Sequence, residues 1–167
     1  MTAVTPEWET RNDELWAAID DHDPADFRRL IADHAAVLGD DHPVSLFERA
    51  CAWDSTGHSD KAVPLYDRAL ALGLEGVRRR RVVIQMASSI RNLGRPAETL
   101  ALLTEERMRT SDELDDAVVV MSALALADLG REREGLSMVV TAMAAHLPRY
   151  QRSTRNYARL LVEPETA

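Results

Sequence analysis

The feature that most constrains this chain is a glycine-containing turn that recurs at a nearly constant interval. Gly57, Gly94 and Gly130 are 37 and 36 residues apart. A small residue precedes each glycine by seven positions, a large apolar residue precedes it by four, and another follows it by nine. An interval of this length is typical of proteins in which each repeat is one pair of packed helices. These positions are Ala50, Ala87 and Ala123, then Trp53, Ile90 and Leu126, then Tyr66, Leu103 and Val139.

Start and stop signals divide the chain into about nine helices separated by short turns. Thr5-Pro6, Asp23-Pro24, His42-Pro43 and Leu147-Pro148 resemble helix starts, since proline at the first helical position lacks only a donor that is unpaired there. Residues 110–113 read as a capping box that opens a helix at 111. No polar–apolar alternation is long enough for a strand. The sequence therefore predicts an all-α chain of antiparallel helix pairs, with helices near 6–21, 24–38, 43–56, 59–72, 76–93, 96–108, 111–129, 132–147 and 149–161.

Composition limits the classes of partner and the compartment. The 167 residues are 46% hydrophobic and 29% charged, which suits one globular domain over 1–167. A net charge of −8 disfavours nucleic acid as a partner. The single cysteine, Cys51, allows no intrachain disulfide, and no apolar stretch is long enough to cross a membrane. The N-terminal residues lack the basic start and the apolar run of a signal peptide, so we expect a cytoplasmic protein.

The repeat positions resemble the tetratricopeptide repeat family, in particular a divergent bacterial group of it. The resemblance covers three repeats over 43–148; residues 6–42 form a degenerate N-terminal hairpin, and 149–161 a C-terminal capping helix. The third repeat departs from the family pattern, because Gly135 stands where the family has alanine. The resemblance implies a right-handed superhelical solenoid of antiparallel helix pairs. The first full repeat matches best, at Ala50, Trp53, Gly57, Ala62, Tyr66 and Ala69.

The same resemblance implies a non-catalytic interaction module whose first helices line a concave groove. The middle of the predicted groove is apolar, which suits a peptide or helix from a partner protein. Two alternatives stay open: the apolar positions pack against one another, or they join copies of the chain into a homo-oligomeric scaffold. The predicted groove residues are Phe47, Cys51, Asp54, Arg81, Ile84, Ser88, Arg91, Asn92, Val120 and Leu124.

The arginine run at 78–81 is the sharpest charge anomaly in this acidic chain. Four successive arginines fan around a helix and form no flat patch, and they stand near a helix N-terminus, which disfavours cations. We expect a nearby acid to compensate, either Glu75, Glu48 or the pair at 40–41. The alternative is that the run binds an acidic partner or a nucleic-acid phosphate.

The sequence gives little support to a catalytic or metal-binding function. The clusters at 20–23 and 40–42 lie at opposite ends of one predicted helix, about 20 Å apart, so they cannot share a metal; acidic turns of this kind are usually caps. Cys51 has no histidine within one helical turn. No glycine-rich phosphate loop and no metal-ligand spacing is present. We therefore expect no enzyme activity, no cofactor and no metal.

Overall fold

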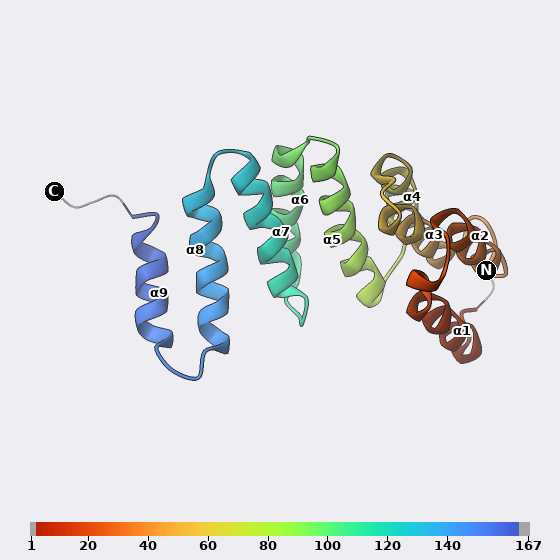
Figure 1. Cartoon of the computed structure of the whole chain (residues 1–167), viewed down its shortest axis with the longest axis horizontal. Helices are drawn as coiled ribbons and strands as arrows, with labels where there is room; N and C mark the ends of the chain where they lie inside the picture. Colours follow the sequence, from red (N-terminus) through yellow and green to blue (C-terminus); the bar gives the residue numbers. More distant parts are fainter. Residues whose placement is uncertain (1–2, 164–167) are drawn as a thin grey trace. The chain divides into compact units, whose positions relative to one another are not determined.

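The computed structural model describes residues 3–163, and within them every regular element is helical. The helices form two compact units, Met1–Ser89 and Ile90–Ala167, and the long helix α5 extends from the first into the second. The elements are α1 Pro6–Ala17, η1 Ile19–Asp21, α2 Pro24–Ala36, α3 Pro43–Ser55, α4 Ser59–Ala71, α5 Gly76–Asn92, α6 Pro96–Arg109, α7 Asp115–Asp128, α8 Glu132–Met143, η2 Ala144–His146 and α9 Gln151–Leu160 (Figure 1).

Seven of the described helices begin where the sequence predicts, and three of these have a side-chain cap at the predicted start. The Thr5 hydroxyl accepts a hydrogen bond from the Trp8 backbone N–H, and Asp23 Oδ1 accepts one from Ala25. His42 Nδ1 accepts one from the Val44 N–H at 3.2 Å. In each case the cap satisfies a backbone donor that the first helical turn leaves unpaired. The acidic and histidine-containing turns at 20–23 and 40–42 thus include helix caps.

The turns at the three repeated glycines share one geometry. Gly57 has φ +83°, and the N–H of His58 donates to the Trp53 carbonyl five residues back. This is the Schellman arrangement, in which a left-handed residue just after the helix lets the chain satisfy the last carbonyls. A side chain with a Cβ would be strained at that φ, so the repeat interval reflects a backbone requirement. Gly94 and Gly130 close α5 and α7 in the same way.

Two predicted helix starts are wrong. The helix expected at 111 begins at Asp115, because Ser111 and Asp112 use their polar groups to close a tight turn instead. The Ser111 hydroxyl donates to Asp115 Oδ2 at 2.5 Å. The last helix begins at Gln151, because Tyr150 adopts a left-handed conformation with φ +70°. Side-chain bonds and one backbone torsion therefore delay both helices by two to four residues.

One core cluster of the first unit consists of large apolar side chains from α1 and α2 that pack with Ala52 of α3. Phe27 and Ile31 are completely buried, and Leu15 packs with them. The Trp16 ring meets Phe27 edge-on at a centroid distance of 5.1 Å. The degenerate N-terminal hairpin thus packs its large side chains against Ala52 of the first full repeat.

In the second unit, α8 packs against both α7 and α9 (Figure 1). Gly135 of α8 is buried, and a Cβ built on it would lie 2.8 Å from the backbone oxygen of Ala123 in α7. The two helices approach so closely that no side chain fits at this crossing. This explains why the chain has glycine where the family pattern has alanine.

Substituting Gly135 with alanine is expected to lower the free energy of unfolding by up to about 2 kcal/mol. The overpacking penalty is roughly 1–3 kcal/mol. We expect it to exceed the gain of about 1 kcal/mol in helix propensity, because the added Cβ meets backbone atoms of α7 that cannot move aside easily. Thermal unfolding followed by far-UV circular dichroism measures the change. Thr141→Ala, at an exposed position of the same helix, is the control and should differ little from wild type. A more stable Gly135→Ala variant would contradict the close approach.

Candidate interaction surface

The predicted groove positions on α3 are mostly core residues. Phe47 is completely buried and Cys51 is 2% exposed. The centroid of the Phe47 ring lies 6.5 Å from that of the Tyr66 ring of α4. The guanidinium carbon of Arg81 lies over the Phe47 ring, 5.1 Å from its centroid. As the structure stands, Phe47 and Cys51 stabilise the first unit and offer no surface to a partner. Ile84, at 8% exposed, is also buried.

A buried polar cluster surrounds Cys51. The Tyr66 hydroxyl lies 3.6 Å from Cys51 Sγ and 3.3 Å from Asp54 Oδ2, and the Ser89 hydroxyl donates to Asp54 Oδ1 at 2.5 Å. The thiol itself donates to Gln85 Oε1 at 3.4 Å. Burial raises the pKa of Cys51 to about 12 and also raises the pKa of Asp54. The thiol therefore stays protonated at neutral pH, which is the opposite of what a nucleophile needs.

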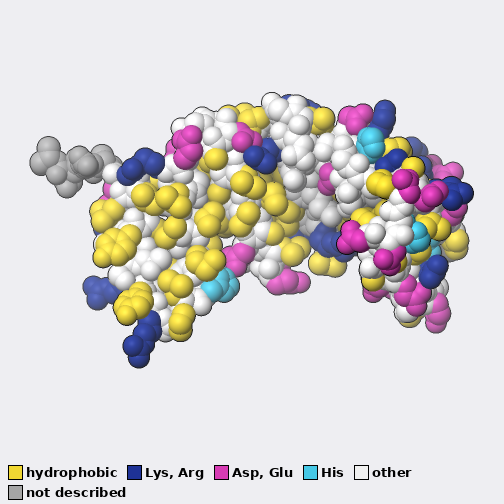
Figure 2. All heavy atoms as spheres, viewed as in Figure 1, with side chains coloured by type: hydrophobic (Ala, Val, Ile, Leu, Met, Phe, Trp, Pro, Cys, Tyr) yellow, Lys and Arg dark blue, Asp and Glu magenta, His cyan; other side chains and the backbone are white. Residues whose placement is uncertain are grey.

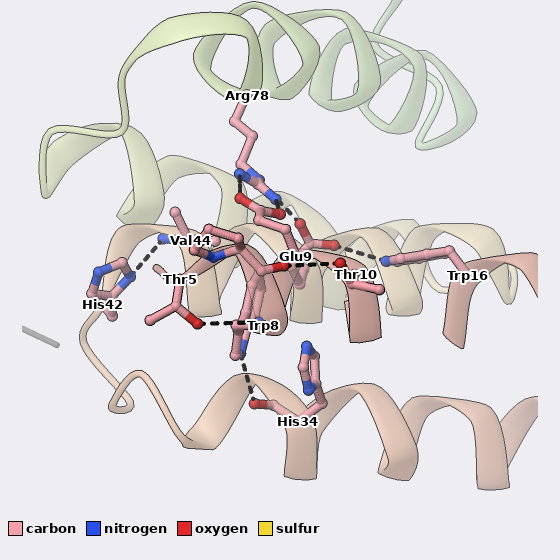
Figure 3. Close-up of polar contacts among 11 residues, drawn as sticks. Thr5, Trp8, Glu9, Thr10, Trp16, His34, His42, Val44 and Arg78 are labelled. Carbon is pink, nitrogen blue, oxygen red and sulfur yellow. Dashed lines mark hydrogen bonds and ion pairs between the residues drawn. The ribbon is translucent and has the colours of Figure 1, made fainter. Parts of the chain in front are cut away.

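Arg78 of the arginine run is engaged inside the first unit. Its guanidinium donates to both carboxylate oxygens of Glu9, at 2.8 and 2.6 Å (Figure 3). Its Nε donates to Glu48 at 3.2 Å. Trp16 Nε1 donates to the other oxygen of Glu48 at 2.8 Å. Glu48 is 2% exposed, so Arg78 compensates a buried charge. Glu48 is one of the acids that the sequence predicts as partners of the run; Glu9, 69 residues from Arg78, is not.

The remaining predicted positions differ in exposure. Asp54 and Ser88 are half-buried, while Arg81 and Asn92 are exposed. In the second unit, Arg91 forms an ion pair with Asp128 of α7, with Nη2 donating to Oδ1 at 3.0 Å. The two ends of that pair come from helices that the resemblance assigns to the groove.

The apolar positions on α7 are open to solvent. Val120 is 42% exposed and Leu124 is 39% exposed. They continue onto α8 and α9 through further exposed apolar side chains, and Figure 2 shows hydrophobic side chains gathered over these three helices, on the left of the view. We call this surface the C-terminal apolar face; its residues are Val120, Leu124, Leu136, Met143, Tyr157 and Leu160.

Helical geometry places these residues on one side of the three helices. On α8, Gly135 faces α7, and Ser137 faces α9 because its hydroxyl donates to the Ala158 carbonyl. Leu136 lies between them in sequence and points about 100° from each, toward a side that neither neighbour covers. Met143, seven residues on, returns to the same side. The face is therefore perpendicular to the contacts that hold α8 in place.

The same geometric argument applies to α7 and α9, the helices on either side of α8. Val120 and Leu124 lie three residues before and one residue after Ala123, the residue of α7 that meets α8. Tyr157 directly precedes Ala158, the residue of α9 that meets α8. Because neighbouring helices run antiparallel, these offsets turn all three side chains toward the side of Leu136. Leu160 lies at the outer edge of the face.

Sequence reasoning missed the α8 contribution. It assigned the binding surface to the first helix of each pair and expected the last helix, with an apolar stripe of Tyr150, Tyr157, Leu160 and Leu161, to cap the repeats. Tyr157 is 67% exposed and Leu160 50% exposed, so that stripe is open in the described residues. A signal for α8 was present: Leu136, Val140 and Met143 repeat at helical spacing beside the small residues that make its packing contacts.

Among the described residues, no group of three or more His, Cys, Asp or Glu side chains is placed to hold a metal ion. No helix within residues 3–163 combines the length and apolar character needed to cross a membrane. Fold and surface together define an all-helical repeat protein that has an exposed apolar face.

The family model for the tetratricopeptide repeat matches residues 43–161, and the chain belongs to this family. Its members generally mediate protein–protein interactions and are typically non-catalytic. The match extends through α9, so the last helix is part of the family pattern. No curated protein and no solved structure gave a significant match.

Proposed function

We propose that this chain is a non-catalytic protein-interaction module that binds its partner through the second unit. The observation that carries the proposal is the C-terminal apolar face, whose side chains are 39–67% exposed. Contiguous apolar patches of several hundred Å² are uncommon on soluble monomers and mark interaction sites. Family membership supports the same role.

Only some of the groove residues that the family resemblance predicts support this proposal. Val120 and Leu124 are the predicted groove residues that are both apolar and exposed. The Arg91–Asp128 ion pair stands at the C-terminal end of the same helix, where it adds a polar border. A partner peptide or helix running along α7 would bury the two apolar side chains and meet that border at one end.

Photo-cross-linking tests the proposed site. We expect benzoyl-phenylalanine introduced in place of Leu124 to form covalent adducts with a protein in extract of the source cells. The matched control places the same group at Met108 of α6, which is 85% exposed but lies outside the face. Adducts at position 124 that are absent at 108, identified by mass spectrometry, are the expected result. No adduct at either position, or equal adducts at both, would remove the α7 surface as the binding site.

A further inference from the structure

The C-terminal apolar face is preformed. Arg133 of α8 donates through Nε to the Leu161 carbonyl at the end of α9, at 2.9 Å. The buried Ser137 hydroxyl donates to the Ala158 carbonyl of the same helix at 2.7 Å. These two bonds, one turn apart on each helix, fix α9 beside α8. A surface held in this way loses little conformational freedom when a partner covers it.

The width of the face limits what can cover it. Packed helices lie about 8–10 Å apart, so a layer of three is roughly 25–30 Å across. A single partner helix has a diameter of about 10–12 Å with its side chains. Such a helix, if it lay parallel to α7, α8 and α9, would cover the side chains of one or two of them and leave either Tyr157 or Val120 in water. A helix lying across the layer would cover only a strip about 10 Å wide, which is the distance that separates Leu136 from Met143 along α8. An occupant of matching width is another layer of helices.

We propose that a second copy of this chain covers the face, so that the two layers of α7, α8 and α9 pack against each other about a two-fold axis near α8. The inference rests on the proposed function and names the partner of that same surface. A two-fold contact needs a surface that complements itself, and apolar side chains meeting their own copies satisfy this requirement. Leu136 and Met143 of the two α8 helices would then form the centre of the interface.

The exposed area fits this arrangement. Six side chains that are 39–67% exposed, with total areas of roughly 150–230 Å² each, present about 600 Å² of surface. A stable interface of standard size covers about 800 Å² on each partner, and in homodimers about 65% of it is apolar, which is roughly 520 Å². The face therefore supplies the apolar part of one half of a dimer interface.

The arginines of α9 point away from the proposed interface between the two copies. Arg152, Arg155 and Arg159 are five and two residues before Tyr157 and two after it, so they stand about 140–160° from it around the helix. The helix consequently has a basic side and an apolar side, and only the apolar side belongs to the face. Two copies can approach through the apolar sides without bringing these arginines together. Charged residues are likewise depleted at the centre of known interfaces.

The test is the solution mass of the purified full chain, measured by light scattering behind a sizing column at roughly 1–100 µM. We expect about 37 kDa, twice the 18.6 kDa of one chain. Tyr157→Asp and, separately, Leu124→Asp are expected to raise the dissociation constant about a hundredfold or more, since each buries a carboxylate in the apolar interface, once on each side of the two-fold axis. Met108→Asp, outside the face, should leave the mass at that of the dimer.

Each outcome decides the inference. Because Tyr157 and Leu124 are exposed, both variants should fold, and equal circular dichroism spectra check this. A wild-type mass of 18.6 kDa throughout the series, or a dimer that persists in both variants, would overturn the second copy as the occupant. If the chain is a monomer but position 124 still forms adducts with another protein, the proposed function stands and only this inference fails. A monomer without adducts would defeat both.

Discussion

Replacing Arg78 with leucine is expected to lower the free energy of unfolding of the first unit by about 3–5 kcal/mol, the range for breaking a buried ion pair by removing one partner. Glu48 is 2% exposed and would lose the guanidinium that neutralises it at 3.2 Å. Glu9 would lose a two-oxygen pairing with the same group. The Glu9 pairing also raises the pKa of Arg78 above its ordinary value, so the arginine stays charged.

Tryptophan fluorescence during urea unfolding measures this effect selectively. All three tryptophans, Trp8, Trp16 and Trp53, belong to the first unit, so their emission follows that unit. Arg29→Leu is the matched control, because Arg29 is 70% exposed and pairs with the exposed Asp26. We expect it to change stability by about 0.5 kcal/mol or less.

A double variant separates the ion pair from the loss of arginine packing. Arg78→Leu combined with Glu48→Met removes the uncompensated carboxylate as well as the guanidinium. Such replacement of both partners by apolar groups is often nearly neutral. The double variant is therefore expected to be more stable than Arg78→Leu alone. A double variant less stable than the single one would show that the buried charge is not what destabilises Arg78→Leu.

Truncating Tyr66 to alanine should destabilise the first unit by about 3–5 kcal/mol, as expected for a buried aromatic residue. The side chain is completely buried at the centre of the first full repeat and lies against Phe47. Its removal leaves a cavity that packed helices cannot readily fill. It also removes the hydroxyl that lies 3.3 Å from the half-buried Asp54 carboxylate.

Tyr66→Phe separates packing from hydrogen bonding. Phenylalanine keeps the ring but not the hydroxyl, while Ser89 continues to donate to Asp54. We expect a loss of about 1–2 kcal/mol, in the range for removing one hydrogen-bonding group. Urea unfolding followed by tryptophan fluorescence again measures both variants. If the two variants were equally destabilised, the polar cluster rather than the ring would dominate this position.

The sequence pattern was sufficient to predict the turns and helix starts that depend only on neighbouring residues. The turns at Gly57, Gly94 and Gly130 follow from a positive φ, and the starts after Thr5, Asp23 and His42 follow from unpaired backbone donors. Both depend on residues within one turn of each other, so the sequence shows them directly. The helix start predicted from the capping box at 110–113 was wrong for an equally local reason. Ser111 and Asp112 can stabilise a turn as well as they can cap a helix.

The predicted surface required information that local pattern does not contain. Phe47 and Val120 occupy the same repeat position, yet one is completely buried and the other is 42% exposed. Arg81 and Tyr66 cover Phe47, and their approach depends on how α3, α4 and α5 pack. The equivalence of positions in a repeat therefore predicts which side of a helix a residue faces, but not whether that side is covered.

By itself, the sequence determined that this chain is a series of antiparallel helix pairs of the tetratricopeptide type, because turn torsions, caps and helical spacing act over a few residues. Only the tertiary structure decided that Arg78 pairs with Glu9 across 69 residues, that Gly135 is needed where α8 meets α7, and that α8 contributes to the apolar face. These features depend on distances between helices, which are set by the fit of all side chains at each contact and not by the pattern along one helix.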